Sequence, residues 1–356
     1  MDFSLDETQQ SVADLAATVL RGDADGTRVE QALAGESGYD ERLWKAMAQA
    51  GLLALALPES LGGDGFGTIE VASVLSEVGR QTVPVPALAT LSLGVLPVVA
   101  LGSTQHQRLL LPEVADGRIL TAALRGTPDS TAVTASRHRE GYVVTGTRVC
   151  VPYAAQAYRI LLASHVGVLL IDPSADGVAL TRTYSATGSA EYTVELNEVE
   201  VPQSELLTTD VRAVERFAVA GAAAMADGVI AGALALTAEH VRNRHQFGKP
   251  LATFQAVAQQ IADVYITART LSLTSASVNW RLASGLDADD DLDIAAYWVA
   301  AELPTALQVC HHLHGGLGVD YTYPLHRFYS QAKDLARFVG GAAARLDLIG
   351  ARCSST

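Results

Sequence analysis

The chain has 356 residues, enough for one large domain or two to three smaller ones. Hydrophobic residues make up 49% of it and charged residues only 18%, so it can bury a large core, and this argues against wholesale disorder. The formal net charge of −14 repels phosphate backbones, so we expect no nucleic-acid partner.

Targeting signals and cysteine usage indicate the compartment. The start of the chain, MDFSLDETQQ, is polar and acidic, unlike a secretory signal. No charge-free apolar run is long enough to span a membrane, so we expect no membrane partner. The cysteines Cys150, Cys310 and Cys353 are odd in number and widely spaced, which does not suggest a disulfide framework. We therefore expect a cytoplasmic protein.

The chain up to about residue 120 is predicted to be helical. Alanine dominates its apolar residues, which suits closely packed helices. A glycine-rich loop, PESLGGDGFG at 58–67, interrupts the helical pattern, which resumes with IEVASVLSEVGR. We assign residues 1–120 to an N-terminal α-helical domain.

From about residue 121 the pattern becomes that of strands. Short segments rich in Val, Ile, Tyr and Thr are separated by Gly, Pro, Asp or Ser. The clearest are YVVTGTRVCV, YRILLAS, VGVLLID and EYTVELNEVEV. We assign residues 121–205 to a middle β domain with mostly antiparallel strands.

Helical patterns then continue to the end of the chain. A long Ala/Gly-rich helix is predicted to end near Arg244, and its small side chains would let neighbouring backbones approach closely. Further helices are predicted over 252–284 and 292–314. The acidic stretch DADDDLD at 287–293 is predicted to be a solvated turn and helix start, because its spacing does not match a calcium loop. We assign residues 206–356 to a C-terminal helical bundle.

The stretch RHQFGKPLATFQ at 244–255 is the first candidate site. Arg244 and Phe247 share one face of a helix end, and Gln255 lies near the start of the next helix. A guanidinium, an aromatic face and an amide at such a corner can bind a pyrophosphate and its nucleoside. The alternative is a C-terminal helix cap with Gly and Pro as a stop, and spacing alone leaves both open.

The stretch CHHLHGGLGVDYTYPLHR at 310–327 is the second candidate site. Cys310 and His314 are four residues apart, and His311 and His312 lie on the same turn. A zinc site would need three or four converging ligands, whereas adjacent helical histidines point about 100° apart. We therefore expect no metal, but histidines that are satisfied internally or face a cofactor. The following glycines either let a backbone approach a ligand or end the helix.

Together these stretches resemble the acyl-CoA dehydrogenase family. Its pattern is an Arg, two residues, Phe-Gly, and a Gln near the next helix start. Later come a Gln, two residues, two glycines and a Tyr-Pro. RHQFGKPLATFQ and HLHGGLGVDYTYPLHR follow this order, and PESLGGDGFG is similar to the family's first glycine loop. The resemblance implies an α+β fold with an N-terminal helical domain, a middle β-barrel or sandwich domain and a C-terminal four-helix bundle.

The resemblance also implies flavin adenine dinucleotide, FAD, at an interface between subunits. In the family, residues of one subunit hold the ADP half of a flavin whose ring lies in the neighbouring subunit. The family's glutamine is a histidine here, and an imidazole can still donate a hydrogen bond or stack. Carried over by position, the cofactor-binding residues are Arg244, Phe247, Phe254, Gln255, His312, Gly315 and Gly316.

Judged by the same resemblance, the residues for the family's chemistry are missing. The reaction needs a carboxylate base beside the flavin ring. Most members have a Glu where this chain has Val339, and others have one where it has Ala218. Glu215 lies about one turn before Ala218, so a shifted helix could bring it in. We assign no catalytic residue, and ALRGTPDST and RVCVPYAAQA also lack the family's residues around the flavin ring.

This split pattern resembles the non-catalytic subunit of the heteromeric α2β2 acyl-CoA dehydrogenases with which bacteria shorten sterol side chains. The resemblance implies a catalytic homologue as the partner in an α2β2 heterotetramer. A steroid-CoA thioester, derived from a cholesterol side chain, would bind mainly in that partner. Two alternatives stay open: a self-sufficient homo-oligomeric enzyme that uses Glu215, and a non-enzymatic scaffold that binds CoA or flavin.

Overall fold

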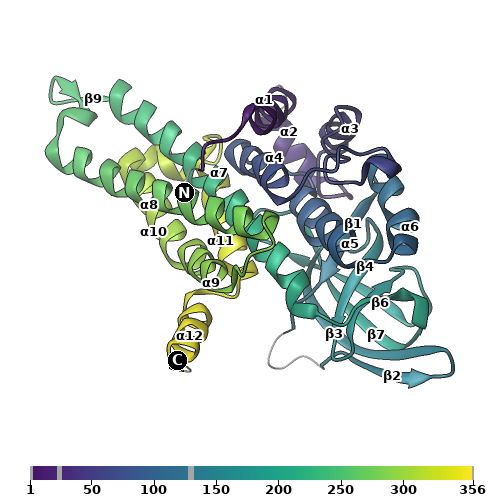
Figure 1. The fold of residues 1–356 in the computed structure, drawn as a ribbon. Coiled ribbons are helices and arrows are strands. Elements are labelled where there is room, and N and C mark those ends of the chain that lie inside the picture. The colour runs from purple at the N-terminus through teal and green to yellow at the C-terminus, as the bar shows by residue number, and fades with distance from the viewer. Residues whose placement is uncertain (1–2, 22–25, 127–131, 355–356) are drawn as a thin grey trace. The chain divides into compact units, whose positions relative to one another are not determined.

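The computed structural model describes residues 3–21, 26–126 and 132–354 (Figure 1). By their contacts these residues form two compact units. The helical unit comprises the described parts of 1–28, 72–83 and 219–356, and the sheet unit comprises 29–71 and the described parts of 84–218. Each unit thus combines segments that are distant in sequence, and the domain division at 1–120, 121–205 and 206–356 stays a prediction.

Helices precede and follow a central run of strands, which confirms the predicted α+β class. The first helices are α1 (Glu7–Arg21), α2 (Gly26–Ala34), α3 (Glu41–Gln49), α4 (Thr68–Gln81), α5 (Leu96–Leu101) and α6 (Thr104–Ala115). The central strands are β1 (Ile119–Ala123), β2 (Thr134–His138), β3 (Gly141–Pro152), β4 (Ala157–Ser164), β5 (Gly167–Ile171), β6 (Val178–Tyr184), β7 (Ala190–Pro202) and β8 (Leu206–Thr208). The remaining elements are α7 (Val211–Asn243), β9 (His245–Gln246), β10 (Lys249–Pro250), α8 (Gln255–Ala283), α9 (Asp289–Tyr297), α10 (Leu303–His314), α11 (Leu325–Phe338) and α12 (Ala342–Cys353).

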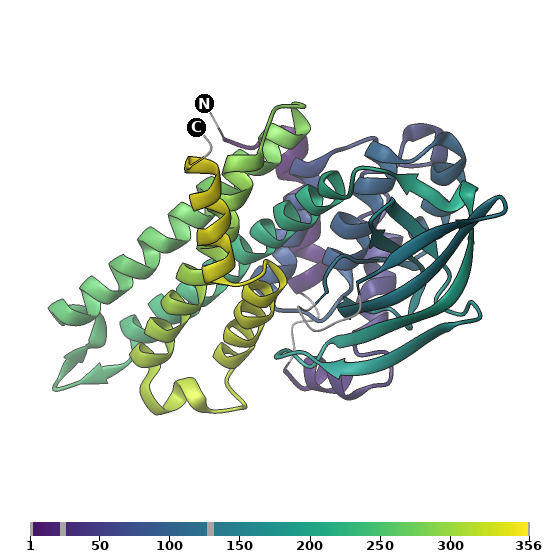
Figure 2. The same ribbon diagram turned by 90° about the horizontal axis from the view of Figure 1, so that it is seen from below.

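The strands of the sheet unit form two four-stranded sheets, whose long strands are visible in Figure 2. One has the order β1-β4-β5-β8 and the other the order β2-β3-β7-β6. Pairing is antiparallel except between β1 and β4, which are parallel. The strands predicted from apolar runs correspond to β3, β4, β5 and β7. Strands β2 and β6 were missed because they are largely exposed and have few apolar residues.

The core of the sheet unit lies around the first sheet. Strands β1 and β5 are buried along their whole length, as strands are when both faces of a sheet are covered. The second sheet contacts it where β3 meets β1 and β7 meets β5. A π-helix, Leu88–Val95, packs against β1, and Gly94 permits the approach because a Cβ there would lie 2.8 Å from Cγ of Leu120.

In the helical unit, α4 and α7 cross with their backbones in contact. A Cβ on Gly228 would lie only 1.7 Å from the carbonyl oxygen of Ser76. A Cβ on Gly79 would lie 2.2 Å from the carbonyl oxygen of Met225. Beside the crossing, the Ser76 hydroxyl donates a hydrogen bond of 3.1 Å to Asp227. Small residues in the long predicted helix therefore serve a close backbone approach, as expected.

Helix α7 is long and apolar enough to cross a membrane, judged by length and composition alone. However, 67% of its most apolar window is buried inside the molecule. The same helix makes the glycine crossing with α4. These contacts are those of a core helix.

Replacing Gly228 with alanine is expected to lower the free energy of unfolding by roughly 3 kcal/mol, because the added methyl group collides with helix backbone. Urea denaturation measures the change. The matched control is Gly350→Ala on α12, where a Cβ would meet no atom within 4 Å. That substitution is expected to be neutral or slightly stabilising, since alanine favours helix. Equal effects of the two substitutions would contradict the crossing.

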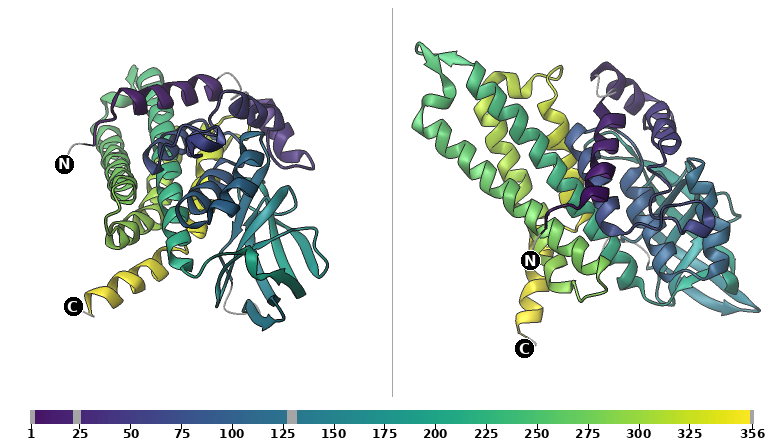
Figure 3. Two further views of the ribbon diagram at one scale, coloured as in Figure 1. Left: turned by 45° about the vertical axis from the view of Figure 1, so that its right-hand side comes forward. Right: turned by 45° about the horizontal axis from the view of Figure 1, so that its top comes forward.

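The remaining helices complete a bundle around α7. Helices α7 and α8 run side by side and are joined at one end by the strands β9 and β10 (Figure 3). Helix α8 contacts α9 and α10, and α10 contacts α11. The end of α7 and the start of α8 are therefore presented together at one tip of the helical unit.

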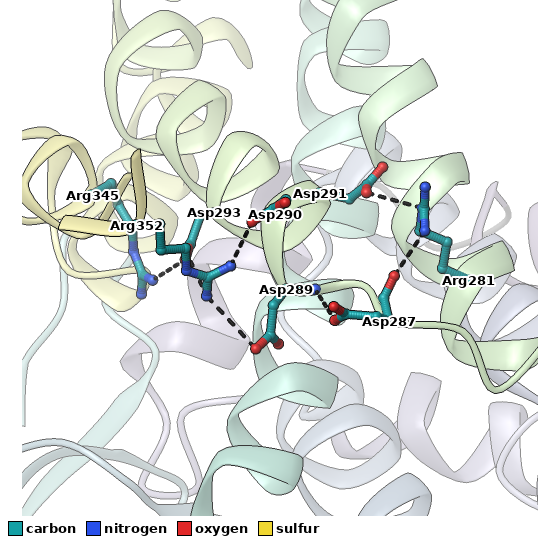
Figure 4. Close-up of polar contacts among 8 residues, drawn as sticks. All are labelled: Arg281, Asp287, Asp289, Asp290, Asp291, Asp293, Arg345 and Arg352. Atoms are coloured by element: carbon teal, nitrogen blue, oxygen red, sulfur yellow. Dashed lines mark hydrogen bonds and ion pairs between the residues drawn. The ribbon is translucent and has the colours of Figure 1, made fainter. Parts of the chain in front are cut away.

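The acidic stretch 287–293 was predicted to be a solvated turn and helix start; α9 does begin within it, at Asp289, but the prediction of solvation is wrong for Asp293 (Figure 4). Arg352 of α12 lies 2.9 Å from carboxylate oxygens of both Asp290 and Asp293, and Arg345 lies 3.4 Å from Asp293. The side chain of Asp293 is only 8% exposed. No described residue of α12 is buried, so charge rather than apolar packing holds this helix to α9. The prediction failed because the arginines lie more than fifty residues further along the chain.

Arg352→Gln is expected to speed amide exchange across α12 about fivefold, the effect of roughly 1 kcal/mol. The estimate is modest because the Arg352 side chain is partly exposed and water screens its ion pairs. High salt is expected to act in the same direction. Arg337→Gln, which removes a surface pair with Asp334 on α11, is the control and should leave α12 unchanged. Unaltered exchange in Arg352→Gln would show that other contacts hold the helix.

Candidate cofactor-binding site

Helix α7 ends in a β-hairpin. Strands β9 and β10 pair antiparallel, and Phe247 and Gly248 form a two-residue turn between them. Both turn residues have positive φ angles, 53° and 76°, as such turns require. The amide of Arg244 donates to the carbonyl of His240 at 2.8 Å, and the amide of Leu251 donates to the carbonyl of Arg244 at 2.8 Å. The backbone of Arg244 is therefore fixed at the base of the hairpin.

The hairpin holds Phe247 out into solvent. A phenylalanine in the left-handed backbone region is strained, and here its side chain is also 91% exposed. Its ring meets the edge of Phe254 at a centroid distance of 6.2 Å. The ammonium group of Lys249 lies 4.4 Å from the centre of the Phe254 ring. Backbone strain of this kind is concentrated at ligand-binding and other functional sites.

Positive charge is concentrated at this tip. Residues 240–249 include two arginines, a lysine and two histidines but no acidic residue, in a chain of net charge −14. Arg244 is exposed there, and the exposed Gln255 begins α8 just beyond the hairpin. Arg244, Phe247 and Gln255 therefore lie on or beside the same hairpin, but the expectation that Arg244 and Phe247 share a helix face is wrong, because α7 ends at Asn243 and Phe247 lies in the hairpin turn. Lys249 belongs to the hairpin as well, although the sequence pattern did not single it out.

The glycine turn follows directly on α10. Gly315 has φ 58° and ends the helix, and a short 3₁₀ turn continues to Val319. A Cβ on Gly315 or Gly316 would meet no atom within 4 Å, so the backbone there is open to approach. Gly318 is different, since a Cβ would lie 2.9 Å from the carbonyl oxygen of His311. His312 is exposed beside this turn.

A pair of histidines joins the two segments. The ring of His240, in the last turn of α7, stacks on the ring of His314 at 4.4 Å and 22°. His314 donates from Nδ1 to the carbonyl of Cys310 at 2.8 Å, and its Nε2 accepts from the hydroxyl of Tyr323 at 3.1 Å. Burial lowers the pKa of both imidazoles, and the charge of Arg244 lowers that of His240 further. Neutral rings can stack without charge repulsion.

The surroundings of Cys310 do not suit a metal. The thiol is buried, and burial raises its pKa to about 11, so it stays protonated at neutral pH. Both imidazole nitrogens of His314 are already used in hydrogen bonds. Within the described residues, no group of three or more His, Cys, Asp or Glu side chains is placed to share a metal ion.

The two positions predicted for the family's bases lie in different units. Val339, in the helical unit, is fully buried at the end of α11, and its carbonyl accepts a hydrogen bond from Arg345. Ala218, in the sheet unit, is buried on α7, and Glu215 is exposed on the same helix. The charge of Glu215 acts on Arg148 of β3, where it partly offsets the lowering of the Arg148 pKa by burial. Glu215 therefore has a partner within its own unit.

The stretches expected around a flavin ring are only partly described. Residues 127–131 of ALRGTPDST lie outside the described residues. In RVCVPYAAQA, the pairing of β3 with β7 is irregular between Arg148 and Val151. Cys150 within this irregularity has φ 57°, and Tyr153 just after β3 has φ 53°. The backbone of this chain is therefore strained at and just after the end of β3.

Comparison with known proteins identifies the class. An acyl-CoA dehydrogenase N-terminal domain model matches residues 5–118, and the C-terminal domain model matches 211–353. The chain is 47% identical to acyl-CoA dehydrogenase FadE28 of Mycobacterium tuberculosis, over the full length of both. A chain in the crystal structure of the ChsE4-ChsE5 complex from Mycobacterium tuberculosis superposes with a TM-score of 0.95 at 33% identity, again covering both chains completely. A chain of a variant of the Tcur3481-Tcur3483 steroid ACAD superposes with a TM-score of 0.91 at 32% identity, covering 98% of this chain and 99% of that one.

The chain belongs to the acyl-CoA dehydrogenase family, as the two domain models and the identity to FadE28 show. Membership places it among the flavoprotein oxidoreductases and gives FAD as its cofactor. The fold inferred from the sequence, with N-terminal helices, central sheets and C-terminal helices, is that of the family.

Proposed function

We propose that this chain is the non-catalytic subunit of a heteromeric FAD-dependent acyl-CoA dehydrogenase. The complex would be a cytoplasmic α2β2 heterotetramer that removes hydrogen from the α and β carbons of a steroid-CoA thioester. The substrate and the catalytic Glu would lie in the partner chain. This chain would supply interface surface and contacts to the ADP half of FAD.

The observation that carries the proposal is the contrast between the hairpin and the base positions. The hairpin keeps an exposed arginine, an exposed strained Phe247 and a basic surface, which together fit a diphosphate and an adenine. The base positions hold Val339 and Ala218, whose side chains cannot accept a proton. Such a chain can bind part of a flavin but lacks the carboxylate for the proton abstraction.

Each residue has a role that follows from its chemistry. Arg244 and Lys249 would neutralise the diphosphate, and Phe247 would stack on the adenine ring. Gln255 and His312 would donate or accept hydrogen bonds, and the open backbone at Gly315 and Gly316 would let the ribose or diphosphate come close. Phe254 would hold the Phe247 ring in place through their edge-to-face contact. FAD, when bound, supplies the hydride acceptor of the family's reaction.

The relatives support the heteromeric and steroid parts of the proposal. Two of the similar solved structures are described as pairs of differently named chains, and one of these is described as a steroid ACAD. Each resembles this chain over at least 98% of its length at more than 30% identity. The alternatives are a homo-oligomeric enzyme using Glu215 and a scaffold without turnover. The electrostatic attraction between Glu215 and Arg148 disfavours the first.

Co-expression with a homologue that keeps the family's Glu is expected to give a yellow complex that reduces an electron-accepting dye with a steroid-CoA thioester. This chain alone is expected to give no turnover, because it has no base.

Arg244→Ala is expected to weaken FAD binding by the complex tenfold or more, the effect of a charge-assisted hydrogen bond. Arg242→Ala is the control, because it removes the same charge from the last turn of α7, two residues before Arg244. It should weaken FAD binding far less. Full activity of this chain alone would refute the proposal.

Glu215→Gln tests the homo-oligomeric alternative directly. We expect an unchanged rate in the assembled complex, because the side chain is exposed and its charge acts on Arg148. If Glu215 were the base, its loss would lower the rate by roughly 10²- to 10⁴-fold. Steady-state dye reduction at saturating substrate separates the two outcomes.

A further inference from the structure

The stacked histidines lie between the two segments proposed to hold the ADP half of FAD. His240 is four residues before Arg244, and its carbonyl accepts the hydrogen bond of the Arg244 amide. His314 immediately precedes Gly315 and Gly316. The rings of His240 and His314 stack at 4.4 Å. A displacement of the His240 ring would therefore move the hairpin segment, and a displacement of the His314 ring would move the glycine turn.

His314 is also fixed from its other sides. Its side chain is buried, and both ring nitrogens are hydrogen-bonded, one to the carbonyl of Cys310 and one to the hydroxyl of Tyr323. These bonds set the ring's tautomer and orientation. His240, by contrast, is only half buried at the end of α7, where its ring stacks on that of His314. The rigid ring of His314 thus determines where the ring of His240 lies.

We propose that His240 and His314 are positioning residues that align the Arg244 hairpin with the glycine turn, so that the two segments hold the cofactor's ADP half as one site. Neither ring needs to touch the cofactor. Removing either ring removes the stack, so the two residues act as one coupled unit. The identity of the bound group rests on the proposed function, whereas the coupling between the segments does not.

A double-mutant cycle tests the coupling, with the full chain in complex with its acyl-CoA dehydrogenase partner and FAD as the probe. His240→Ala and His314→Ala are each expected to weaken FAD binding about tenfold, and the double variant also about tenfold. His240→Phe keeps a ring that can stack on the hydrogen-bonded His314 and should bind FAD nearly as well as the unaltered complex. His138→Ala, an exposed histidine on β2, is the control and should bind normally. Additive losses of about a hundredfold, or no rescue by phenylalanine, would overturn the proposal.

Amide exchange on the full chain without flavin provides a second readout. His314→Ala is expected to speed exchange at residues 240–247 as well as at 312–318, because the stack transmits the change. Faster exchange confined to 312–318 would overturn the proposal. If His314→Ala does not fold, the test uses His240→Ala instead. In that variant we expect faster amide exchange at 312–318, the segment on the other side of the stack. Should Arg244→Ala leave FAD binding unchanged, the proposed function fails, and exchange still decides the coupling.

Discussion

The backbone contact between α4 and α7 is the constraint on which the candidate site depends. At Gly79 and Gly228 the two helices are closer than any side chain would permit. This contact fixes the line of α7 in the helical unit, and α7 then continues for about 22 Å before its last residue. Because a helix is stiff over that distance, the crossing determines where Arg244 and its hairpin are presented. The site is thus placed by packing far from its own residues.

The hairpin is stabilised at its base by backbone hydrogen bonds, but its tip is costly. Phe247 has a strained backbone and an almost fully exposed ring, and the neighbouring cations have no acidic residue among 240–249. Backbone strain costs free energy, and the basic tip and exposed ring can bind a group that neutralises the charge and covers the ring. A diphosphate with a stacked adenine would do both. The physical cost of the hairpin is therefore an argument for a ligand that does not depend on the family.

The sequence predicted the helices and strands with strong apolar periods, and it predicted which residues gather at the hairpin. It could not predict the contacts made between distant segments. The aspartates at 287–293 looked solvated because Arg345 and Arg352 come much later in the chain. Likewise His240 and His314 appeared as parts of separate motifs, and only the fold stacks them. Phe247 was identified by its spacing, but its positive φ and its exposure follow from hairpin geometry that spacing does not reveal.

The two halves of the family's chemistry make different demands on a chain. Proton abstraction needs one carboxylate at one place, and at position 339, where we predict one of the family's bases, this chain has a fully buried valine. The proposed nucleotide contacts instead come from several elements: the strained hairpin, the basic tip, the open glycine turn and the histidine pair between them. Relaxing the strained turn at Phe247 would remove a backbone cost from the isolated chain. A chain that has this hairpin, but neither base at its predicted position, is what the proposed division of work between two subunits requires.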